Sequence, residues 1–320
     1  MIIDISNTLP QIYFDDVEQL DMNDEKILAS QLPRLATLVG WTKKQLDAEL
    51  LVTSMQSLKE NFLQILRSTY SFDNFRILLS ERNIKYHAIH VNDSFNDMSE
   101  EAKKHAQISR IMKTHTDEFI GFAAFNPHHG SKSMRIVRNA ITMQGFKGVT
   151  INPTNHGIPA DHRKYYPVYS LCEEYQIPIW VQSSLNYLEN TSGFIAHPKR
   201  LEKPLLDFPD LQIILGHGGW PWLDDMVTML LKYKNLFVDT TTFTSNDALK
   251  DSSGWKLFLA YANDTLQEQI VFGSEWLKLG QPIQNSIDEI ENWPLDEQVK
   301  EMIFWRNAAK LFKLEIEEGR

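Results

Sequence analysis

The 320-residue sequence has only one cysteine, Cys172, so it excludes an internal disulfide and a zinc site built from cysteine ligands. It has no apolar run near the roughly 20 residues that a membrane-spanning helix needs, and no basic, apolar leader follows Met1. With 32 basic and 42 acidic residues its net charge is −10, and it lacks a Lys/Arg run. These features argue against nucleic acid or membrane as partner. We therefore expect a cytoplasmic protein that handles a small molecule.

Short apolar runs alternate with helical patterns along the chain. Near-continuous apolar runs are typical of parallel strands that are covered on both faces. Helical spacing is seen in Ser133–Met143, Tyr165–Tyr175 and Asp224–Tyr233. Eight repeats of strand and helix predict a (β/α)8 TIM barrel, and we assign residues 1–320 to one domain. The eight expected strands are Met1–Ser6, Lys85–Val91, Phe119–Phe125, Phe146–Ile151, Ile177–Gln182, Leu211–Leu215, Leu236–Thr240 and Gln269–Phe272.

Almost eighty residues separate the first two strands, far more than one barrel helix requires. We interpret residues 9–80, approximately, as including a helical insertion over the barrel mouth that is a lid, with a dimerisation element or a plain surface excursion as the alternatives. Pro33 and Gly40 are expected to break its helices. Its helical windows are Asn23–Leu32, Thr42–Leu51 and Leu58–Ser68; a last helix, Asp296–Glu315, should close the barrel.

Catalytic groups of TIM barrels lie at the carboxyl ends of the strands, and two residues there have suitable chemistry. His217 follows the sixth strand among three glycines, and a neutral imidazole transfers protons near pH 7. Glu275 follows the eighth strand, where it is a general base or an orienter of His217. The alternatives are a buried histidine bonded to a barrel neighbour and a glutamate paired with a lysine or arginine.

Other side chains at the barrel mouth are candidates for substrate contact. His128 and His156 lie on the third and fourth mouth loops. Trp220 and Trp276 flank the mouth and would form a wall for a planar substrate, although packing is the alternative for each. His87 and His90 are three residues apart on one strand, so they should point to opposite faces and not chelate together.

The strand ends resemble the amidohydrolase superfamily, in the amidohydrolase-2 branch of aminocarboxymuconate-semialdehyde decarboxylase and γ-resorcylate decarboxylase. The resemblance runs from the first strand to the last helix, skips the insertion, and implies a TIM barrel with a hydrolase or decarboxylase (carboxy-lyase) activity. The matching stretches are Met1–Asp4, Gly121–Ala123, Asn126–Pro127, Gly145–Gly148, Pro178–Val181, Phe208–Leu211, Leu215–Trp222, Phe272–Ser274 and Asn307–Phe312.

The sequence departs from this family at its metal ligands. The family pattern has Asp-x-His-x-His on the first strand, where this chain has Ser6 and Thr8. The histidine that ends the fifth strand is Gln182 here, and the aspartate of the last strand is Glu275, whereas the proton-transferring histidine is kept as His217. A catalytic zinc site needs about three protein ligands, so we expect no metal cofactor.

Three functions remain open. The first is a metal-independent enzyme that hydrolyses or decarboxylates a small, possibly aromatic or unsaturated, carboxylic acid, ester or lactone. His217 and Glu275 would transfer protons in it, and Ser6, Thr8 and Gln182 would bind an oxygen of the substrate. The second is a non-catalytic ligand-binding descendant. The third is a zinc or manganese enzyme that recruits His90, His128, His129 or His156 instead. The resemblance also suggests a homodimer.

Overall fold

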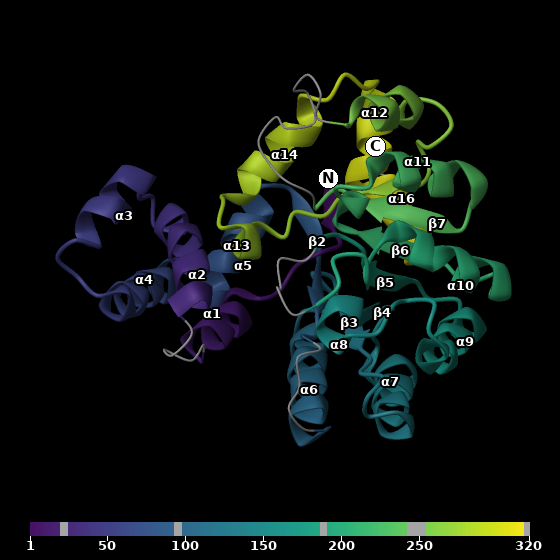
Figure 1. Ribbon diagram of the computed structural model, residues 1–320, viewed down its shortest axis with the longest axis horizontal. Helices are drawn as coiled ribbons and strands as arrows, with labels where there is room; N and C mark the ends of the chain where they lie inside the picture. Colours follow the sequence, from purple (N-terminus) through teal and green to yellow (C-terminus); the bar gives the residue numbers. More distant parts are fainter. Residues whose placement is uncertain (20–24, 93–97, 186–190, 242–253, 317–320) are drawn as a thin grey trace.

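The computed structural model describes residues 1–19, 25–92, 98–185, 191–241 and 254–316, and it contains all eight expected strands (Figure 1). The strands pair in parallel in the order of the sequence, from β1 to β8. Backbone hydrogen bonds from Ile5 to Phe272 and from Glu275 to Ser6 join the two ends of this sheet. The predicted TIM-barrel fold is therefore confirmed. The strands are β1 Ile2–Asp4, β2 Ile84–His90, β3 Phe119–Ala124, β4 Gly148–Ile151, β5 Ile179–Gln182, β6 Ile213–Gly216, β7 Leu236–Asp239 and β8 Ile270–Val271.

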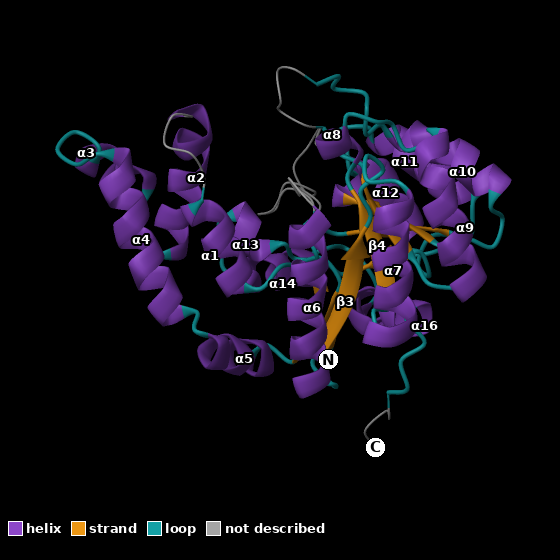
Figure 2. Ribbon diagram, turned by 90° about the horizontal axis from the view of Figure 1, so that it is seen from below, coloured by secondary structure: helices purple, strands orange, loops and turns teal. Residues whose placement is uncertain are grey.

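Helices surround the strands, and the carboxyl ends of the strands open on the side where α8 lies (Figure 2). The helical patterns predicted from the sequence correspond to α7, α9 and α11. After β2 the helices are α6 Met98–Thr114, α7 Ser131–Gln144, α8 Pro153–His156, α9 Tyr166–Tyr175, α10 Glu202–Asp207, α11 Leu223–Lys232, α12 Lys256–Ala262, α13 Trp276–Leu279 and α14 Ile283–Glu291. The chain ends with α15 Glu297–Glu301, a π-helical turn Met302–Arg306 and α16 Asn307–Leu311.

The last helices close the amino-terminal end of the barrel, as the sequence predicts. Trp305 and Ala308 are buried against Ile3 and Ile214, which belong to the barrel strands. The N–H of Phe272 also donates to the carbonyl of Ile303, in the π-helical turn. Because this end is filled with apolar side chains, a ligand can enter only from the opposite end, where the polar residues gather.

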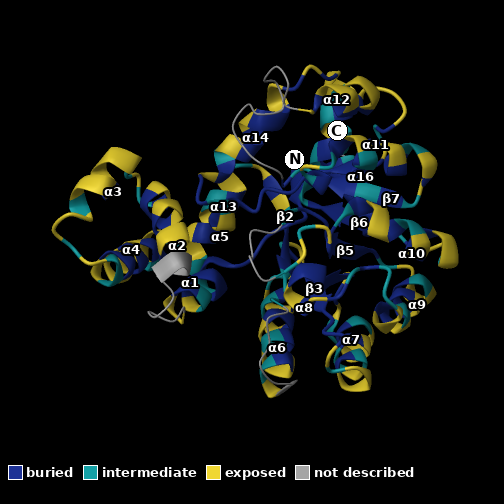
Figure 3. Ribbon diagram, viewed as in Figure 1, coloured by how far each residue is buried: buried dark blue, intermediate teal, exposed yellow. Residues whose placement is uncertain are grey.

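The long segment between β1 and β2 is helical and stands beside the barrel rather than across its mouth (Figures 1 and 2). Burial colours show that α3 and α4 expose much of their outer surface (Figure 3). Among its described residues, those in the cavity wall at the carboxyl ends of the strands belong to its first helix, with effects described below. Its helices are α1 Pro10–Glu18, α2 Glu25–Leu38, α3 Lys43–Glu49, α4 Met55–Thr69 and α5 Phe72–Glu81.

The predicted break at Pro33 is wrong, because α2 continues through this residue to Leu38. A proline inside a helix costs about 3 kcal/mol. The neighbouring side chains of Leu32 and Leu35 are buried, and each such burial contributes about 1.5–3 kcal/mol, which offsets that cost. The break at Gly40 is confirmed, since this glycine has a left-handed backbone with φ of 82°.

Among the described residues, none of the helices is both long enough and apolar enough to span a membrane.

Candidate active site

A cavity of about 270 Å³ opens at the carboxyl ends of the strands. Four residues predicted from the sequence, Ser6, Thr8, His217 and Glu275, lie in its wall. The remaining lining residues come from α1 and from the ends of β1, β2, β4, β5 and β8. They are Asn7, Tyr13, Asp16, His90, Val91, Asn92, Thr150, Asn152, Asn155, Trp180 and Lys278. A cavity at this end of the barrel is where TIM-barrel enzymes hold their active sites.

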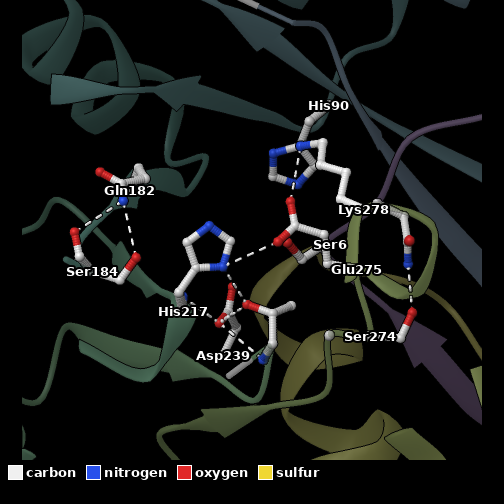
Figure 4. Close-up of polar contacts among 12 residues, drawn as sticks. Ser6, His90, Gln182, Ser184, His217, Asp239, Ser274, Glu275 and Lys278 are labelled. Atoms are coloured by element: carbon white, nitrogen blue, oxygen red, sulfur yellow. Dashed lines mark hydrogen bonds and ion pairs between the residues drawn. The ribbon is translucent and has the colours of Figure 1, made fainter. Parts of the chain in front are cut away.

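The imidazole of His217 is held at one of its two nitrogens (Figure 4). Its Nδ1 lies 2.8 Å from the hydroxyl of Thr241 and 3.3 Å from a carboxylate oxygen of Glu275. The Thr241 hydroxyl in turn lies 2.7 Å from a carboxylate oxygen of Asp239. Among the described residues no partner contacts Nε2, and the side chain lines the cavity. The nitrogen available to a ligand is therefore Nε2.

The direction of these hydrogen bonds follows from Asp239. This buried carboxylate accepts bonds from three N–H groups: the indole of Trp180 at 2.6 Å and the backbones of His217 and Thr241 at 2.7 and 3.3 Å. Burial raises the pKa of Asp239 above its ordinary value, although the neighbouring His217 and the hydrogen bonds from the Thr241 hydroxyl, Trp180 and the His217 backbone act to lower it. Because Asp239 is an acceptor, the Thr241 hydroxyl donates to it and accepts from Nδ1–H. Nε2 of neutral His217 then carries the lone pair.

Glu275 lies between His217 and Lys278. One carboxylate oxygen is 3.3 Å from Nδ1 of His217, and the other accepts a hydrogen bond of 2.8 Å from the Lys278 ammonium. Burial acts to raise the pKa of Glu275, but the charge of Lys278 and the neighbouring His217 outweigh it and lower the pKa below its ordinary value. Glu275 is therefore ionised at neutral pH and stabilises a positive charge on His217.

His217 and Glu275 both have a left-handed backbone, with φ of 60° and 42°. This conformation costs a residue with a side chain about 1–2 kcal/mol. The chain is closely packed at Gly273, two residues before Glu275. A Cβ added there would lie 2.6 Å from the methyl carbon of Thr241 and 3.0 Å from the Cβ of Ser6. Residues with a strained backbone cluster at functional sites. Here Nδ1 of His217 lies 3.3 Å from a carboxylate oxygen of Glu275.

Several residues expected at the mouth lie elsewhere. The Gln182 amide donates to the backbone oxygen and the hydroxyl of Ser184 and accepts from Thr154, and it does not belong to the described cavity wall (Figure 4). His128 donates to the carbonyl of His156, so these two residues hold one mouth loop to the next.

The remaining expected residues also lie away from the cavity. His156 contacts the hydroxyl of Tyr165 at 2.8 Å, and burial lowers the pKa of His156 to about 3. Trp276 is fully buried and packs against Tyr70 and Phe75. Trp220 lies outside the described cavity wall, beside the sixth strand's end. The apolar packing of Trp276 is the alternative that the sequence left open.

Several residues of this site were not predicted from the sequence, and four of them show why. Asp239 and Thr241 fix the tautomer of His217, and a polar pair two residues apart at the end of β7 was their only signal. Tyr13 and Asp16 belong to the insertion, and α1 brings both into the cavity wall. No strand end marks them, so only the three-dimensional packing of α1 against the barrel identifies them.

The residues at the family's ligand positions do not fit a metal ion. Ser6 and Thr8 offer neutral hydroxyls, which are poor ligands for zinc or manganese. Gln182 is bonded away from the cavity, and Glu275 has the Lys278 ammonium 2.8 Å away, which repels a cation. Within the described ranges, no three His, Cys, Asp or Glu side chains come together in a group able to hold a metal. This includes the mouth histidines.

The barrel and the cavity at its mouth have the arrangement of TIM-barrel enzymes. A family model described as Amidohydrolase matches residues 70–314, which is more than half of the chain, and the protein belongs to this family. The match leaves β1 and the helices α1 to α4 outside. No curated protein sequence matches the chain.

Solved structures share the fold at low identity. An uncharacterised TIM-barrel protein, Bb4693 from Bordetella bronchiseptica, is 19% identical with a TM-score of 0.70 over 98% of each chain. A 5-carboxyvanillate decarboxylase from Novosphingobium aromaticivorans, complexed with manganese, is 18% identical with a TM-score of 0.62 over 85% of this chain and 93% of its own. A 4-oxalomesaconate hydratase from Rhodopseudomonas palustris is 18% identical with a TM-score of 0.59 over 98% and 96%.

Proposed function

We propose that the protein is a metal-independent hydrolase of a small carboxylic ester or lactone, in which His217 is the general base. The observation that carries this proposal is the chain of hydrogen bonds from Nδ1 of His217 through Thr241 to Asp239. It leaves the lone pair of Nε2 toward the cavity. In the neutral form of His217, this lone pair can accept a proton from a water molecule in the cavity.

The reaction would begin when Nε2 of His217 removes a proton from a water molecule in the cavity. The water oxygen then bonds to the acyl carbon, and the electron pair of the carbonyl bond moves to its oxygen. The protonated imidazole is stabilised by Glu275, whose carboxylate is 3.3 Å from Nδ1. When the bond to the leaving alkoxide breaks, Nε2–H returns the proton to that oxygen, which yields an acid and an alcohol.

Ser6, Thr8 and the amide group of Asn152 line the same cavity and are the candidate donors to the developing oxyanion. A Lewis-acid metal contributes several kcal/mol to such a step. A site that relies on neutral donors therefore suits a labile substrate, such as an activated ester or a strained lactone.

Decarboxylation of a small carboxylic acid is the second candidate. It needs His217 in its protonated form, so that Nε2–H delivers a proton to the carbon that loses CO₂. The carboxylate of Glu275 near Nδ1 favours that form, and a relative of the same fold is a decarboxylase. The two reactions use the same nitrogen in opposite protonation states.

Turnover of 4-nitrophenyl acetate and dihydrocoumarin by the chelator-treated protein would test the proposal. We expect His217→Asn and Glu275→Gln to lower kcat/KM by about 100-fold or more without changing the fold. His162→Asn is the matched control, because His162 caps a surface turn through Nδ1, a bond that asparagine also makes.

The outcomes of this turnover test distinguish the proposed hydrolase from a binding protein and from a metal enzyme. No turnover of either ester, or full turnover by His217→Asn, would contradict the proposal. A non-catalytic binding protein would show changed affinity for a ligand but no turnover to lose. Activity that appears only when manganese or zinc is added would instead favour a metal enzyme with relocated ligands.

A further inference from the structure

A second histidine in the cavity wall, His90 at the end of β2, is held rigidly. Its ring stacks on Phe122 with centroids 4.2 Å apart and planes 10° apart, and it meets Trp180 edge-on at 5.1 Å. Its Nε2 lies 2.8 Å from the carbonyl oxygen of Ile5. The face, the edge and one nitrogen of this ring are therefore fixed by the barrel.

The contact with Ile5 decides which nitrogen of His90 carries the proton. A carbonyl oxygen only accepts hydrogen bonds, so Nε2 must be the N–H donor. In the neutral ring the lone pair is then on Nδ1. No partner contacts Nδ1 among the described residues, and His90 lines the cavity. The site thus presents a fixed acceptor to any ligand.

His90 also stays neutral over the whole physiological range. Burial is the main cause that lowers its pKa to about 3, and the positive charge of Lys278 adds to it. Glu275 raises the pKa of His90 and His217 lowers it, and His87 on the same strand is a further titratable neighbour. The nearby ammonium group also disfavours a cationic ligand at this point, so a neutral O–H group is the better donor.

His90 and His217 are within reach of one small molecule. Each imidazole meets the indole of Trp180 edge-on, with a centroid distance of 5.1 Å, so the two rings lie within about 10 Å of each other. The cavity of about 270 Å³ extends to both. A substrate whose acyl carbon meets Nε2 of His217 can therefore place a nearby substituent at His90.

We propose that His90 is a specificity-determining residue, whose Nδ1 accepts a hydrogen bond from a hydroxyl next to the acyl group of the substrate. The inference rests on the proposed function in taking this cavity as the substrate site. It narrows the substrate class to hydroxy acids and their esters or lactones. A site built around such a bond binds analogues without the hydroxyl more weakly, because its own polar atom is then left unpaired, while activated esters without the hydroxyl are still turned over.

Binding of three unreactive amides tests this inference without any need for turnover. Mandelamide has the hydroxyl, 2-methoxy-2-phenylacetamide has it methylated, and phenylacetamide lacks it. We expect the wild-type protein to bind mandelamide about tenfold more tightly than the other two, as one hydrogen bond allows. His90→Phe should bind all three alike, whereas His90→Gln, which keeps a donor and an acceptor, should retain part of the preference.

His87→Leu is the matched control, because His87 lies on the same strand but packs in the core against Phe75. It should leave the preference unchanged. Equal or undetectable binding of the three amides by the wild type, or an unchanged preference in His90→Phe, would overturn the inference. If the hydroxyl preference is present but no ester is hydrolysed, the inference stands and the proposed hydrolysis falls.

A second measurement needs no variant. Nitrogen-15 NMR of the histidine rings reports the tautomer, and we expect His90 to remain neutral with its proton on Nε2 between pH 5 and 9. A proton on Nδ1, or a charged ring at pH 6, would contradict the inference even if the variants fail to fold.

Discussion

The hydroxyl of Thr241 lies 2.8 Å from Nδ1 of His217 and 2.7 Å from the Asp239 carboxylate, and it therefore links the imidazole to a buried acceptor. The indole of Trp180 fixes that acceptor from the other side. This linkage sets the tautomer of His217, while Glu275 supplies the charge that a protonated ring needs. Thr241 thus orients the imidazole of His217, and Glu275 supplies the negative charge beside it.

Thr241→Val removes the link and keeps the shape of the side chain. Nδ1 then has only Glu275 as acceptor, and the ring is free to take either tautomer, so we expect kcat/KM to fall about tenfold with little change in KM. Nitrogen-15 NMR should show a mixture of tautomers for His217. Thr228→Val is the control, since Thr228 bonds only to its own helix on the surface. Unchanged kcat/KM and a single tautomer would remove Thr241 from the mechanism.

Tyr13 tests whether the insertion belongs to the active site. It lies on α1, whose Asp15 and Glu18 are held by Arg67 of α4 at 2.8 Å each. We expect Tyr13→Leu to raise KM about tenfold and to change kcat little, because one wall contact of the substrate is lost. Tyr261→Leu, on the exposed side of α12, is the control. Equal KM values for both variants would make the insertion a surface feature only.

The buried imidazole of His87 makes the free energy of unfolding depend on pH. Burial lowers its pKa to about 3, while an unfolded histidine titrates near 6.5. Between pH 6.5 and 3 the imidazole of His87 is protonated in the unfolded chain but not in the folded chain. The free energy of unfolding therefore falls as the pH falls below 6.5. Asp4 has the opposite effect on the free energy of unfolding. Burial raises its pKa to about 7, so as the pH falls the folded chain binds this proton before the unfolded chain does.

The His87→Leu variant removes the contribution of this imidazole to the pH dependence of stability. We expect the loss of unfolding free energy between pH 6.5 and 5 to become smaller by up to about 2 kcal/mol. Neither ring nitrogen of His87 has a partner at hydrogen-bond distance among the described residues, and its polar neighbours are the Asp4 carboxyl, 3.8 Å from Nδ1, and the Thr8 backbone, so stability at pH 7 should change little. Urea titrations at both pH values measure the difference. An unchanged slope with pH would mean that His87 is not the group responsible.

The barrel could be predicted from the sequence because parallel strands covered on both faces leave apolar runs that a reader can count. The opposite orientations of His87 and His90 also followed from the two-residue period of a strand, and the structure confirms them. Pro33 could not be interpreted locally, since burial of the leucines around it outweighs the cost of a proline.

The site was predictable where a side chain with suitable chemistry lies within a few residues of a strand end, as for His217 after β6 and Glu275 after β8. Trp276 follows Glu275 by one residue, yet the left-handed turn at Glu275 sends the indole into the core. Tyr13 reaches the cavity through the packing of a helix that no local pattern relates to the barrel. The role of Thr241 depends on hydrogen-bond directions, which a one-dimensional sequence does not contain.

The metal content of the protein tests the central claim, proton transfer at His217 without a metal, most directly. Protein purified without chelators or metal-affinity resin is analysed by inductively coupled plasma mass spectrometry, with the Ser6→His/Thr8→His variant as a control that restores two imidazoles. The account predicts less than about a tenth of an equivalent of zinc, manganese and iron together in the wild type, and more in the variant. Close to one equivalent in the wild type would contradict it.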